Sequence, residues 1–355
     1  MDKRWYELAD ILVNYSTRVQ PGERVMISMR EAHTLPLVRA VYKACVKAGA
    51  HAQVQFLSDY LDHSLMRDGT LEQVRQLPEI EAHGMQWADV YFGLRGAHNL
   101  YEFADIPSDV LADYRKAMGA ISGLRWEKTR WVIVRVPNED FAQQAETDVE
   151  TITDLFFSAC LRDWPAETQR WQQWAGKLNQ GGEIRLVGNE TDLRFSFEGR
   201  QWLVGDGHFN MPDGEIFTAP VEGSVDGHIS FEFPGVLGGR LVDNMRLEWV
   251  KGELTHASAG KNEDFLKQIL ASDAGASKLG EFAFGTNESI DRFCKDIFYD
   301  EKIGGTVHVA LGRAYPVCGG TNQSSIHWDI IKDTRRNGAV YLDGQKVFEK
   351  GEFLF

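Results

Sequence analysis

The first half of the chain alternates between helical and strand-like spacing of its apolar residues. Apolar side chains recur every three or four residues from Leu8 to Val19 and from Leu37 to Cys45, which predicts two helices. Short apolar runs predict strands at 24–28, 52–57, 88–93 and 131–136. Because strands that alternate with helices usually lie parallel, we expect an N-terminal α/β domain built on a parallel sheet with helices.

The pattern changes after Gln180-Gly181-Gly182. A last helix is predicted at 163–179, and short alternating runs such as 183–187 and 193–197 then predict many short strands. Only two helices are predicted beyond this point, at about 262–271 and 288–298. We therefore expect an N-terminal α/β domain at 1–179 and a β-rich α+β domain at 180–355, which carries the chemistry described below.

Composition narrows the class of protein. The 355 residues are 43% hydrophobic and carry a formal charge of -14, which is typical of a globular protein and disfavours nucleic acid or an anionic membrane as partner. The start of the chain lacks a secretory signal, and no apolar stretch approaches the ~20 residues that span a bilayer. The four cysteines are widely spaced, without a CxxC pair, so we expect reduced thiols and a cytoplasmic protein.

Several familiar catalytic motifs are absent from the sequence. It contains no GxGxxG after a strand, no P-loop, no GxSxG elbow and no HExxH helix. The chemistry is therefore expected to depend on acidic and histidine residues of the C-terminal domain.

The segment Ile326-His327-Trp328-Asp329-Ile330 is the most informative of these. With the period of two of a strand, His327 and Asp329 project from one face while the apolar residues project from the other. His308 lies in a similar strand, Thr306-Val-His-Val-Ala-Leu311. Each of these residues is a suitable metal ligand, although a hydrogen-bonded structural pair and a packed histidine are the alternatives.

Two glutamates stand among apolar neighbours. Glu215 is followed by Ile-Phe, and Glu281 by Phe-Ala-Phe. A carboxylate in such surroundings requires a cation or hydrogen-bond donors, because its burial is otherwise costly. The cation is either a metal or an internal basic residue, for which Lys302 and Arg240 are the candidates.

Five short motifs occur in order across the C-terminal domain. They are Gly214-Glu-Ile-Phe-Thr-Ala-Pro220, Leu279-Gly-Glu281, Gly305-Thr-Val-His-Val-Ala-Leu-Gly312, Ala314-Tyr-Pro316 and His327-Trp-Asp329. These motifs resemble those of the thermophilic metallo-aminopeptidase family, which is related to aminopeptidases T and S. The N-terminal stretch from Leu8 to Glu23 is also similar to that family.

The resemblance implies a dinuclear aminopeptidase that hydrolyses N-terminal residues of small peptides by means of a metal-bridging hydroxide. It also implies two divalent metal ions per chain (Zn, Co or Mn) and a homodimer. The implied ligands are Glu215, Glu281, His308, His327 and Asp329. Three carboxylates and a hydroxide would offset the four charges of two divalent ions, which fits this set.

Three residues are candidates for catalytic roles. We expect Glu281, the middle member of the ligand set, to bridge the two ions. Tyr315 is expected beside the metals, where its hydroxyl would donate to the tetrahedral oxyanion. Glu301 is a candidate general base because it is close to a ligand in sequence, although a surface charge cluster explains it equally well.

Three alternatives remain open. His308, His327 and Asp329 alone form the two-histidine, one-carboxylate set of non-haem Fe(II) enzymes, and some shorter relatives of the family resemble ring-cleaving dioxygenases of dihydroxypyridines. Glu215 and Glu281 argue against that site because they would crowd the positions needed for oxygen and substrate. The second alternative is a metallo-amidase that acts on a non-peptide small molecule. The third is a binding module without turnover.

Overall fold

The computed structural model describes residues 2–96, 99 and 101–355. Contacts between Cα atoms divide the chain into two compact units, one of Met1–Leu161 with Gly207–Pro212 and the other of Arg162–Asp206 with Asp213–Phe355. Helix α9 (Trp164–Leu178) therefore belongs to the second compact unit. The domain boundary between residues 179 and 180, which the sequence predicts, stays a prediction. Within the described residues, no helix is both long enough and apolar enough to cross a membrane.

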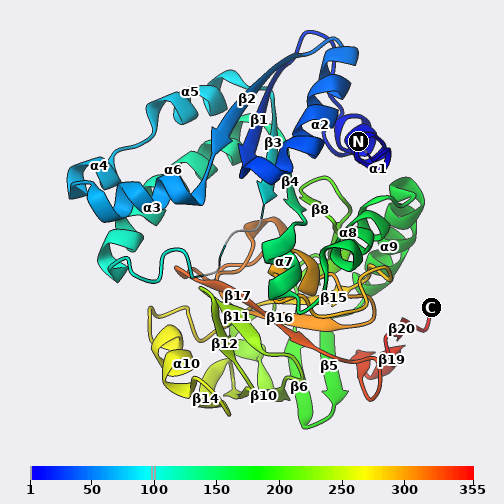
Figure 1. Ribbon diagram of the computed structural model, residues 1–355. Helices are drawn as coiled ribbons and strands as arrows, with labels where there is room; N and C mark the ends of the chain where they lie inside the picture. The colour runs from blue at the N-terminus through cyan, green and yellow to red at the C-terminus, as the bar shows by residue number, and fades with distance from the viewer. Residues whose placement is uncertain (1, 97–98, 100) are drawn as a thin grey trace. The chain divides into compact units, whose positions relative to one another are not determined.

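The first unit is built on a parallel sheet, as predicted from the alternating pattern. Figure 1 shows its strands side by side in the order β2-β1-β3-β4-β8, and all the neighbouring pairs are parallel. Their bounds are β1 (Arg24–Arg30), β2 (His51–Leu57), β3 (Val90–Gly96), β4 (Arg130–Val136) and β8 (Asn210–Met211).

Helices cover both faces of this sheet. Helix α2 contacts β1 and β2, whereas α5 contacts β1 and α6 contacts β4 on the other face, as right-handed crossovers on either side of β1 require. Gly49, with a φ of 80°, ends α2 in the left-handed conformation and turns the chain into β2. The helices are α1 (Arg4–Asp10), the π-helical η1 (Ile11–Ser16), the 3-10 helix η2 (Ala32–Thr34), α2 (Leu35–Lys47), α3 (Asp59–Asp68), α4 (Leu71–Arg75), α5 (Glu79–Trp87), α6 (Ser108–Lys128), α7 (Glu139–Gln144) and α8 (Val149–Cys160).

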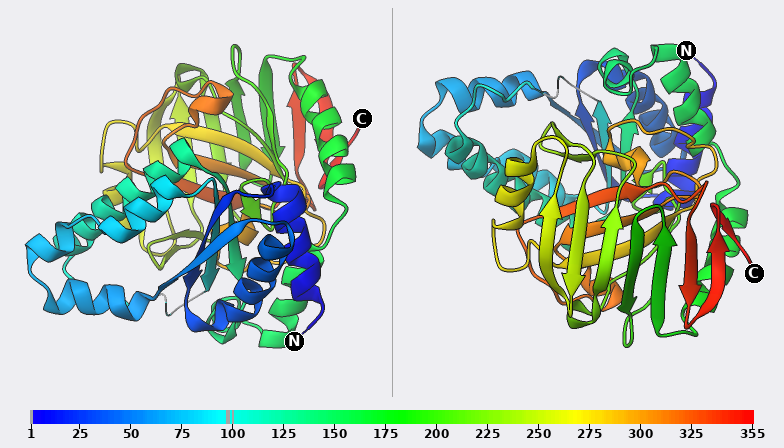
Figure 2. Two further views of the ribbon diagram at one scale, coloured as in Figure 1. Left: turned by 90° about the horizontal axis from the view of Figure 1, so that it is seen from above. Right: turned by 90° about the horizontal axis from the view of Figure 1, so that it is seen from below.

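The second unit consists mainly of two antiparallel sheets packed face to face, which Figure 2 shows in its right-hand view. One has the order β14-β13-β10-β6-β5-β18-β19-β20 and the other β17-β16-β15-β9-β7. Phe195 on β6 and Phe282 on β15 meet between them, with ring centroids 5.1 Å apart. The predicted fold class, an α/β part followed by a β-rich part, is confirmed.

The strands of the larger sheet are β5 (Glu183–Gly188), β6 (Thr191–Ser196), β10 (Asp226–Ser230), β13 (Arg246–Val250), β14 (Glu253–Ser258), β18 (Ala339–Leu342), β19 (Gln345–Glu349) and β20 (Glu352–Phe353). Those of the smaller sheet are β7 (Leu203–Gly205), β9 (Glu215–Thr218), β15 (Leu279–Gly285), β16 (Val307–Gly312) and β17 (His327–Lys332). A separate hairpin joins β11 (Gly235–Leu237) to β12 (Arg240–Val242).

One predicted helix of this unit is wrong. The helix at 262–271 is present as α10 (Glu263–Leu270), but the segment 288–298 contains only the start of the short α11 (Ile297–Asp300). Lys295 has a φ of 59°, which a right-handed helix does not allow. The Asp291 carbonyl accepts from Arg335 Nη1 at 2.9 Å and so bonds outside the segment.

Candidate metal centre

The strand register brings the five predicted ligands to one face of the smaller sheet. Residues that pair directly across two strands share a face, and so do alternate residues along one strand. The pairs that establish this face are Glu215 with Gly285, Ala283 with His308, Glu281 with Ala310, Ala310 with Asp329, and Gly312 with His327. The sequence motifs are therefore adjacent in the fold, although they are spread over four strands.

A β-bulge at Gly280 controls which way Glu281 faces. The pairing shifts between Leu279, which pairs with Leu311, and Glu281, which pairs with Ala310. This extra residue places the two side chains on opposite faces, as bulges commonly do beside functional sites. A Cβ on Gly280 would lie 2.3 Å from the Gly312 carbonyl oxygen, so the bulge requires glycine.

Glu281 lies between the two histidines. Its Oε1 is 3.4 Å from His308 Nε2, and its Oε2 is 3.4 Å from His327 Nε2. Each imidazole also faces a second carboxylate, because Glu215 Oε2 lies 3.4 Å from His308 and Asp329 Oδ1 lies 3.4 Å from His327. The centre thus has two halves that share one carboxylate.

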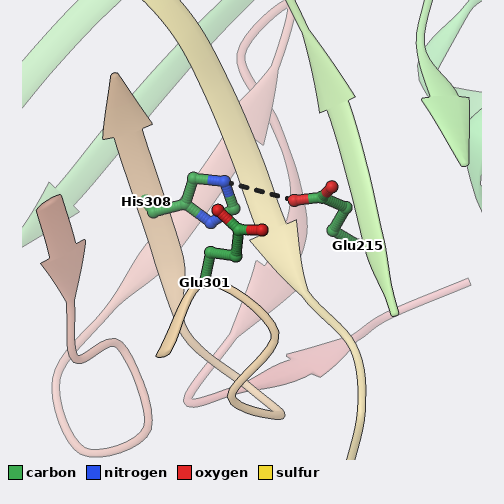
Figure 3. A group of neighbouring side chains, drawn as sticks. All are labelled: Glu215, Glu301 and His308. Atoms are coloured by element: carbon green, nitrogen blue, oxygen red, sulfur yellow. Dashed lines mark ion pairs between the residues drawn. The ribbon is translucent and has the colours of Figure 1, made fainter. Parts of the chain in front are cut away.

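Glu301 completes the half that contains His308. Figure 3 shows Glu215, Glu301 and His308 pointing toward one another from β9, the turn after α11 and β16. One donor atom from each of these residues lies within 4.8 Å of the others, and the same is true of Glu281, His327 and Asp329. The interpretation of Glu301 as part of a solvated surface cluster is therefore wrong, since it faces the centre.

Lys302 is a buried cation beside this half of the centre. Its ammonium group lies 3.3 Å from Glu215 Oε1 and 3.9 Å from Asp213 Oδ1, and it also donates to Glu301. Burial alone would lower the pKa of Lys302, but the carboxylates of Glu215, Glu301 and Asp213 raise it. Glu215 therefore does have Lys302 as a basic partner, which contacts Oε1. The other oxygen, Oε2, faces His308.

Several buried polar atoms of the centre have no hydrogen-bond partner within the part of the chain that the structure describes. They are Glu215 Oε2, Glu281 Oε2, Asp329 Oδ1 and both ring nitrogens of His308. A buried polar atom without a hydrogen bond is costly. These atoms lie together in one place, and they are the oxygen and nitrogen donors that divalent metal ions prefer. These residues therefore fit a metal centre on chemical grounds.

In the arrangement without metal, the protonated imidazoles of His308 and His327 offset the negative charge of the carboxylates around them. Burial would lower the pKa of His308, but Glu215 and Glu281 raise it to about 10, and Asp329 and Glu281 raise that of His327 against the same effect. Burial raises the pKa of Glu301 to about 8. A cation would replace the imidazole protons, because metal binding releases protons from its ligands.

The surroundings of His327 fix its orientation. Its Nδ1 donates to the Arg313 carbonyl at 2.7 Å, which leaves Nε2 to face Glu281 and Asp329. The Tyr315 ring centroid lies 4.7 Å from that of His327. Burial, and then Glu281 and Asp329, raise the pKa of Tyr315, so its hydroxyl is protonated at neutral pH and can act as a donor.

The structure brings together all the residues predicted for the site. Sequence reasoning missed Asp213 and treated Lys302 only as a candidate basic partner of a buried glutamate. Asp213 is buried in the Pro-Asp-Gly turn directly before Glu215, and the Asp300-Glu-Lys302 triplet packs inward from α11. The signal that could have found both is a charged residue within two positions of a predicted site residue, which is Glu215 for Asp213 and Glu301 for Lys302.

The known proteins that this chain is similar to include metalloproteases and aminopeptidases. The family model described as "Thermophilic metalloprotease (M29)" matches residues 1–353. "Aminopeptidase 2" of Geobacillus stearothermophilus is 24% identical, over 100% of this chain and 98% of its own length. "Aminopeptidase AmpS" of Bacillus subtilis is 23% identical, over 98% and 97%.

Among solved structures, AmpT from Thermus thermophilus superposes with a TM-score of 0.88 at 22% identity, over 99% of each chain. A 2,5-dihydroxypyridine dioxygenase from Pseudomonas putida superposes with a TM-score of 0.63 at 14% identity, over 99% of this chain and 96% of the other. At these identities the two likenesses concern the fold alone.

Proposed function

The chain belongs to the M29 family of thermophilic metalloproteases, and on this basis we propose that it is a dinuclear metal-dependent aminopeptidase that removes N-terminal residues from small peptides. The observation that carries the proposal is the position of Glu281, whose two carboxylate oxygens face two different imidazoles. One carboxylate between two groups of donors is the arrangement that a bridging ligand requires.

The proposed ligands divide into two groups. Glu215 and His308 would hold one divalent ion, His327 and Asp329 would hold the other, and Glu281 would contact both. The charges support this count, because Glu215, Glu281 and Asp329 together with a hydroxide would offset two divalent cations. Zinc, cobalt and manganese all accept such nitrogen and oxygen donors.

Bound metal ions would polarise the scissile carbonyl and lower the pKa of a water molecule toward ~7, so that the water attacks near neutral pH. Glu301 is proposed to take the proton of that water and to return it to the leaving amine, since its carboxylate faces Glu215 and His308. Tyr315 is proposed to donate its hydroxyl proton in a hydrogen bond to the developing oxyanion. Lys302 would hold Glu215 and Glu301 in place.

The mononuclear Fe(II) alternative would place His308, His327 and Asp329 on a single ion. The two imidazoles lie in different groups of donors here, with Glu281 between them, which favours two ions. Metal analysis separates the two functions. The aminopeptidase predicts two zinc, cobalt or manganese ions per chain, and the dioxygenase predicts one iron with oxygen uptake.

The main experiment compares Glu281→Gln with Glu248→Gln. Glu248 pairs with Arg246 on β13 of the larger sheet and serves as the matched control. We expect Glu281→Gln to lower hydrolysis of aminoacyl anilides at least ~100-fold and to reduce the bound metal below two ions, while Glu248→Gln resembles the wild type. Equal rates in all three proteins would disprove the proposal. An amide substrate without a free amine, if cleaved faster than the anilide, would instead establish a metallo-amidase.

A homodimer is also part of the proposal, by analogy with the family. Light scattering on the eluate of a size-exclusion column tests it directly, and a mass of one chain at micromolar concentration would contradict it.

A further inference from the structure

An apolar cluster lies beside the candidate metal centre in the second compact unit. The proposed hydrolysis uses only the tyrosine of this cluster, which leaves its other members without a part in the chemistry. We call the cluster the apolar patch. Its buried members are Ala219, Ala314 and Cys318, and the partly buried side chains packed against them are Leu203, Phe217 and Tyr315.

The strand register places two large side chains of the patch on the face that carries the centre. Phe217 follows Glu215 by two residues on β9, so both project from the same face. Phe217 also pairs with Ala283 of β15, which in turn pairs with His308 of β16. Leu203 of β7 pairs with Phe217 on its other side. The row across the sheet therefore runs from the proposed ligand His308, through a small residue, to two large apolar side chains.

The ring of Tyr315 connects the patch to the centre. Its centroid lies 4.7 Å from that of His327 and 6.1 Å from that of Phe217. Cys318 Sγ donates to the Tyr315 carbonyl at 3.1 Å and so helps to hold the turn that carries this ring. A substrate whose scissile carbonyl lies at the centre, beside Tyr315, therefore has the patch within reach of a neighbouring side chain.

The small residues of the patch form a closed floor. A Cβ added to Gly320 would lie 2.5 Å from Ala314 Cβ and 3.0 Å from Ala219 Cβ, so no space is left among them. Leu203 and Phe217, in contrast, remain partly exposed. A ligand that covers apolar surface still in contact with water gains free energy from its burial. The patch therefore receives a side chain against its two larger residues and not beneath them.

The patch favours an uncharged ligand. None of its six members carries a charge at neutral pH, because burial, and then the charge of Glu281, raise the pKa of the Cys318 thiol, and the pKa of Tyr315 is raised as well. A charged side chain placed on the patch would lose its hydration without gaining a partner of opposite sign among these residues.

We propose that the apolar patch binds the side chain of the substrate's N-terminal residue, and that the preferred residues are large and apolar, such as leucine and phenylalanine. The inference rests on the proposed aminopeptidase function, because it takes the scissile carbonyl to lie at the metal centre. Of the two residues that flank the scissile bond, the N-terminal one carries its Cα on the carbonyl carbon itself, so its side chain is the nearer one. Leu203 and Phe217 would determine specificity without taking part in the chemical step.

The first test compares aminoacyl anilides of leucine, phenylalanine, alanine, lysine and glutamate on the metal-loaded full chain. We expect kcat/KM for leucine and phenylalanine to exceed that for alanine at least ~10-fold, since even one methylene group in an apolar site is worth roughly 10–200-fold. Phe217→Ala should reduce this preference at least ~5-fold and leave the alanine anilide nearly unchanged. A preference for the lysine or glutamate anilide would overturn the proposal, as would an equal loss on every substrate in Phe217→Ala.

Phe265→Ala is the matched control for this comparison. Phe265 is a partly exposed phenylalanine on α10, which contacts β12 and β14 and not the strands of the centre. The variant should keep the wild-type preference among the anilides. A loss of preference equal to that in Phe217→Ala would contradict a local role of the patch.

A binding measurement separates this proposal from the proposed hydrolysis. Calorimetric titration of the metal-loaded chain with L-phenylalanine and L-alanine compares ligands with the same amine and carboxylate, so the ratio of their Kd values reports the side chain alone. We expect phenylalanine to bind at least ~10-fold more tightly, and Phe217→Ala to reduce that ratio at least ~3-fold. A wild-type ratio of this size without hydrolysis supports the patch and contradicts the hydrolysis, whereas hydrolysis with a ratio near one overturns the patch. If Phe217→Ala does not fold, Leu203→Ala should reduce the ratio by a similar factor, and an unchanged ratio would overturn the proposal.

Discussion

The ammonium group of Lys302 lies 3.3 Å from Glu215 Oε1, while the other oxygen of the same carboxylate faces His308 at 3.4 Å. Glu215 therefore links a permanent internal cation to the candidate metal centre. Lys302 is fully buried, so its charge acts on the carboxylates with little screening by solvent.

Replacing Lys302 by methionine should destabilise the protein and impair the centre. Removing one member of a buried ion pair typically costs about 3–5 kcal/mol, because the remaining carboxylates are left uncompensated. We expect urea denaturation to report such a loss for Lys302→Met, and hydrolysis per folded molecule to fall at least ~10-fold. Lys332→Met removes another buried lysine, which pairs with Glu232 at 2.7 Å, and should leave hydrolysis per folded molecule unchanged. Wild-type hydrolysis in Lys302→Met would contradict the role given to Lys302.

Glu301→Gln distinguishes a general base from a metal ligand. The substitution keeps the shape of the side chain but removes its ability to accept a proton, so kcat should fall about 10²–10⁴-fold. Metal content, measured by elemental analysis, should stay at two ions per chain. A drop to one ion would assign Glu301 to the ligand set instead. Glu288→Gln, at the exposed residue paired with Arg170, is the control.

Tyr315→Phe should lower kcat by about 10²–10³-fold with little change in KM, because a donor to the oxyanion acts only in the transition state. Steady-state kinetics on an aminoacyl anilide measures both constants. Tyr341→Phe, on β18 of the larger sheet, should leave them unchanged. A change in KM alone would indicate a role in binding the substrate.

Gly280→Ala should disrupt the bulge that directs Glu281 toward the histidines. The added Cβ would meet the Gly312 carbonyl oxygen at 2.3 Å, so the strands must separate, and we expect a lower melting temperature and weaker metal binding. Gly176→Ala is the matched control. Gly176 lies within α9, and a Cβ added there would meet nothing within 4 Å. That variant should be stabilised by roughly 0.5–1 kcal/mol. Equal metal affinity in the two variants would contradict the importance of the bulge.

Removing metal should lower the stability of the chain. A ligand that binds only the folded state at about 100 times its Kd adds about 2.7 kcal/mol, and chelation reverses this gain. Thermal unfolding with and without a chelator measures the shift, and zinc, cobalt or manganese should restore it. The Glu281→Gln variant should show a smaller shift than the wild type. An unchanged melting temperature after verified metal removal would disprove a structural contribution of the metal.

Period-two alternation predicted the strands and the shared face of His327 and Asp329, because that relationship lies within five consecutive residues. The grouping of those two residues with Glu281 depends on register between β15, β16 and β17, which no local pattern contains. The family resemblance supplied the set of ligands where local patterns did not. The bulge at Gly280 is a property of two strands together, so the sequence alone did not indicate it.

Electrostatic partners were the hardest part to predict. Lys302 and Asp213 are charged residues in short connecting segments, where most such residues are solvated, and their burial accompanies contacts between residues far apart in the sequence, such as that of Lys302 Nζ with Asp213 Oδ1 at 3.9 Å. The wrong helix at 288–298 has a related cause. Its apolar spacing suits a helix, but contacts such as the one from Arg335 to the Asp291 carbonyl hold the segment in an irregular path.

The placement of Glu281 between two imidazoles has a mechanical consequence. The width of a single carboxylate sets the spacing between the two halves of the centre, and that carboxylate is attached to β15 alone. A shift of β15 along its neighbours would therefore move the carboxylate that the two halves share, and so change both halves at once.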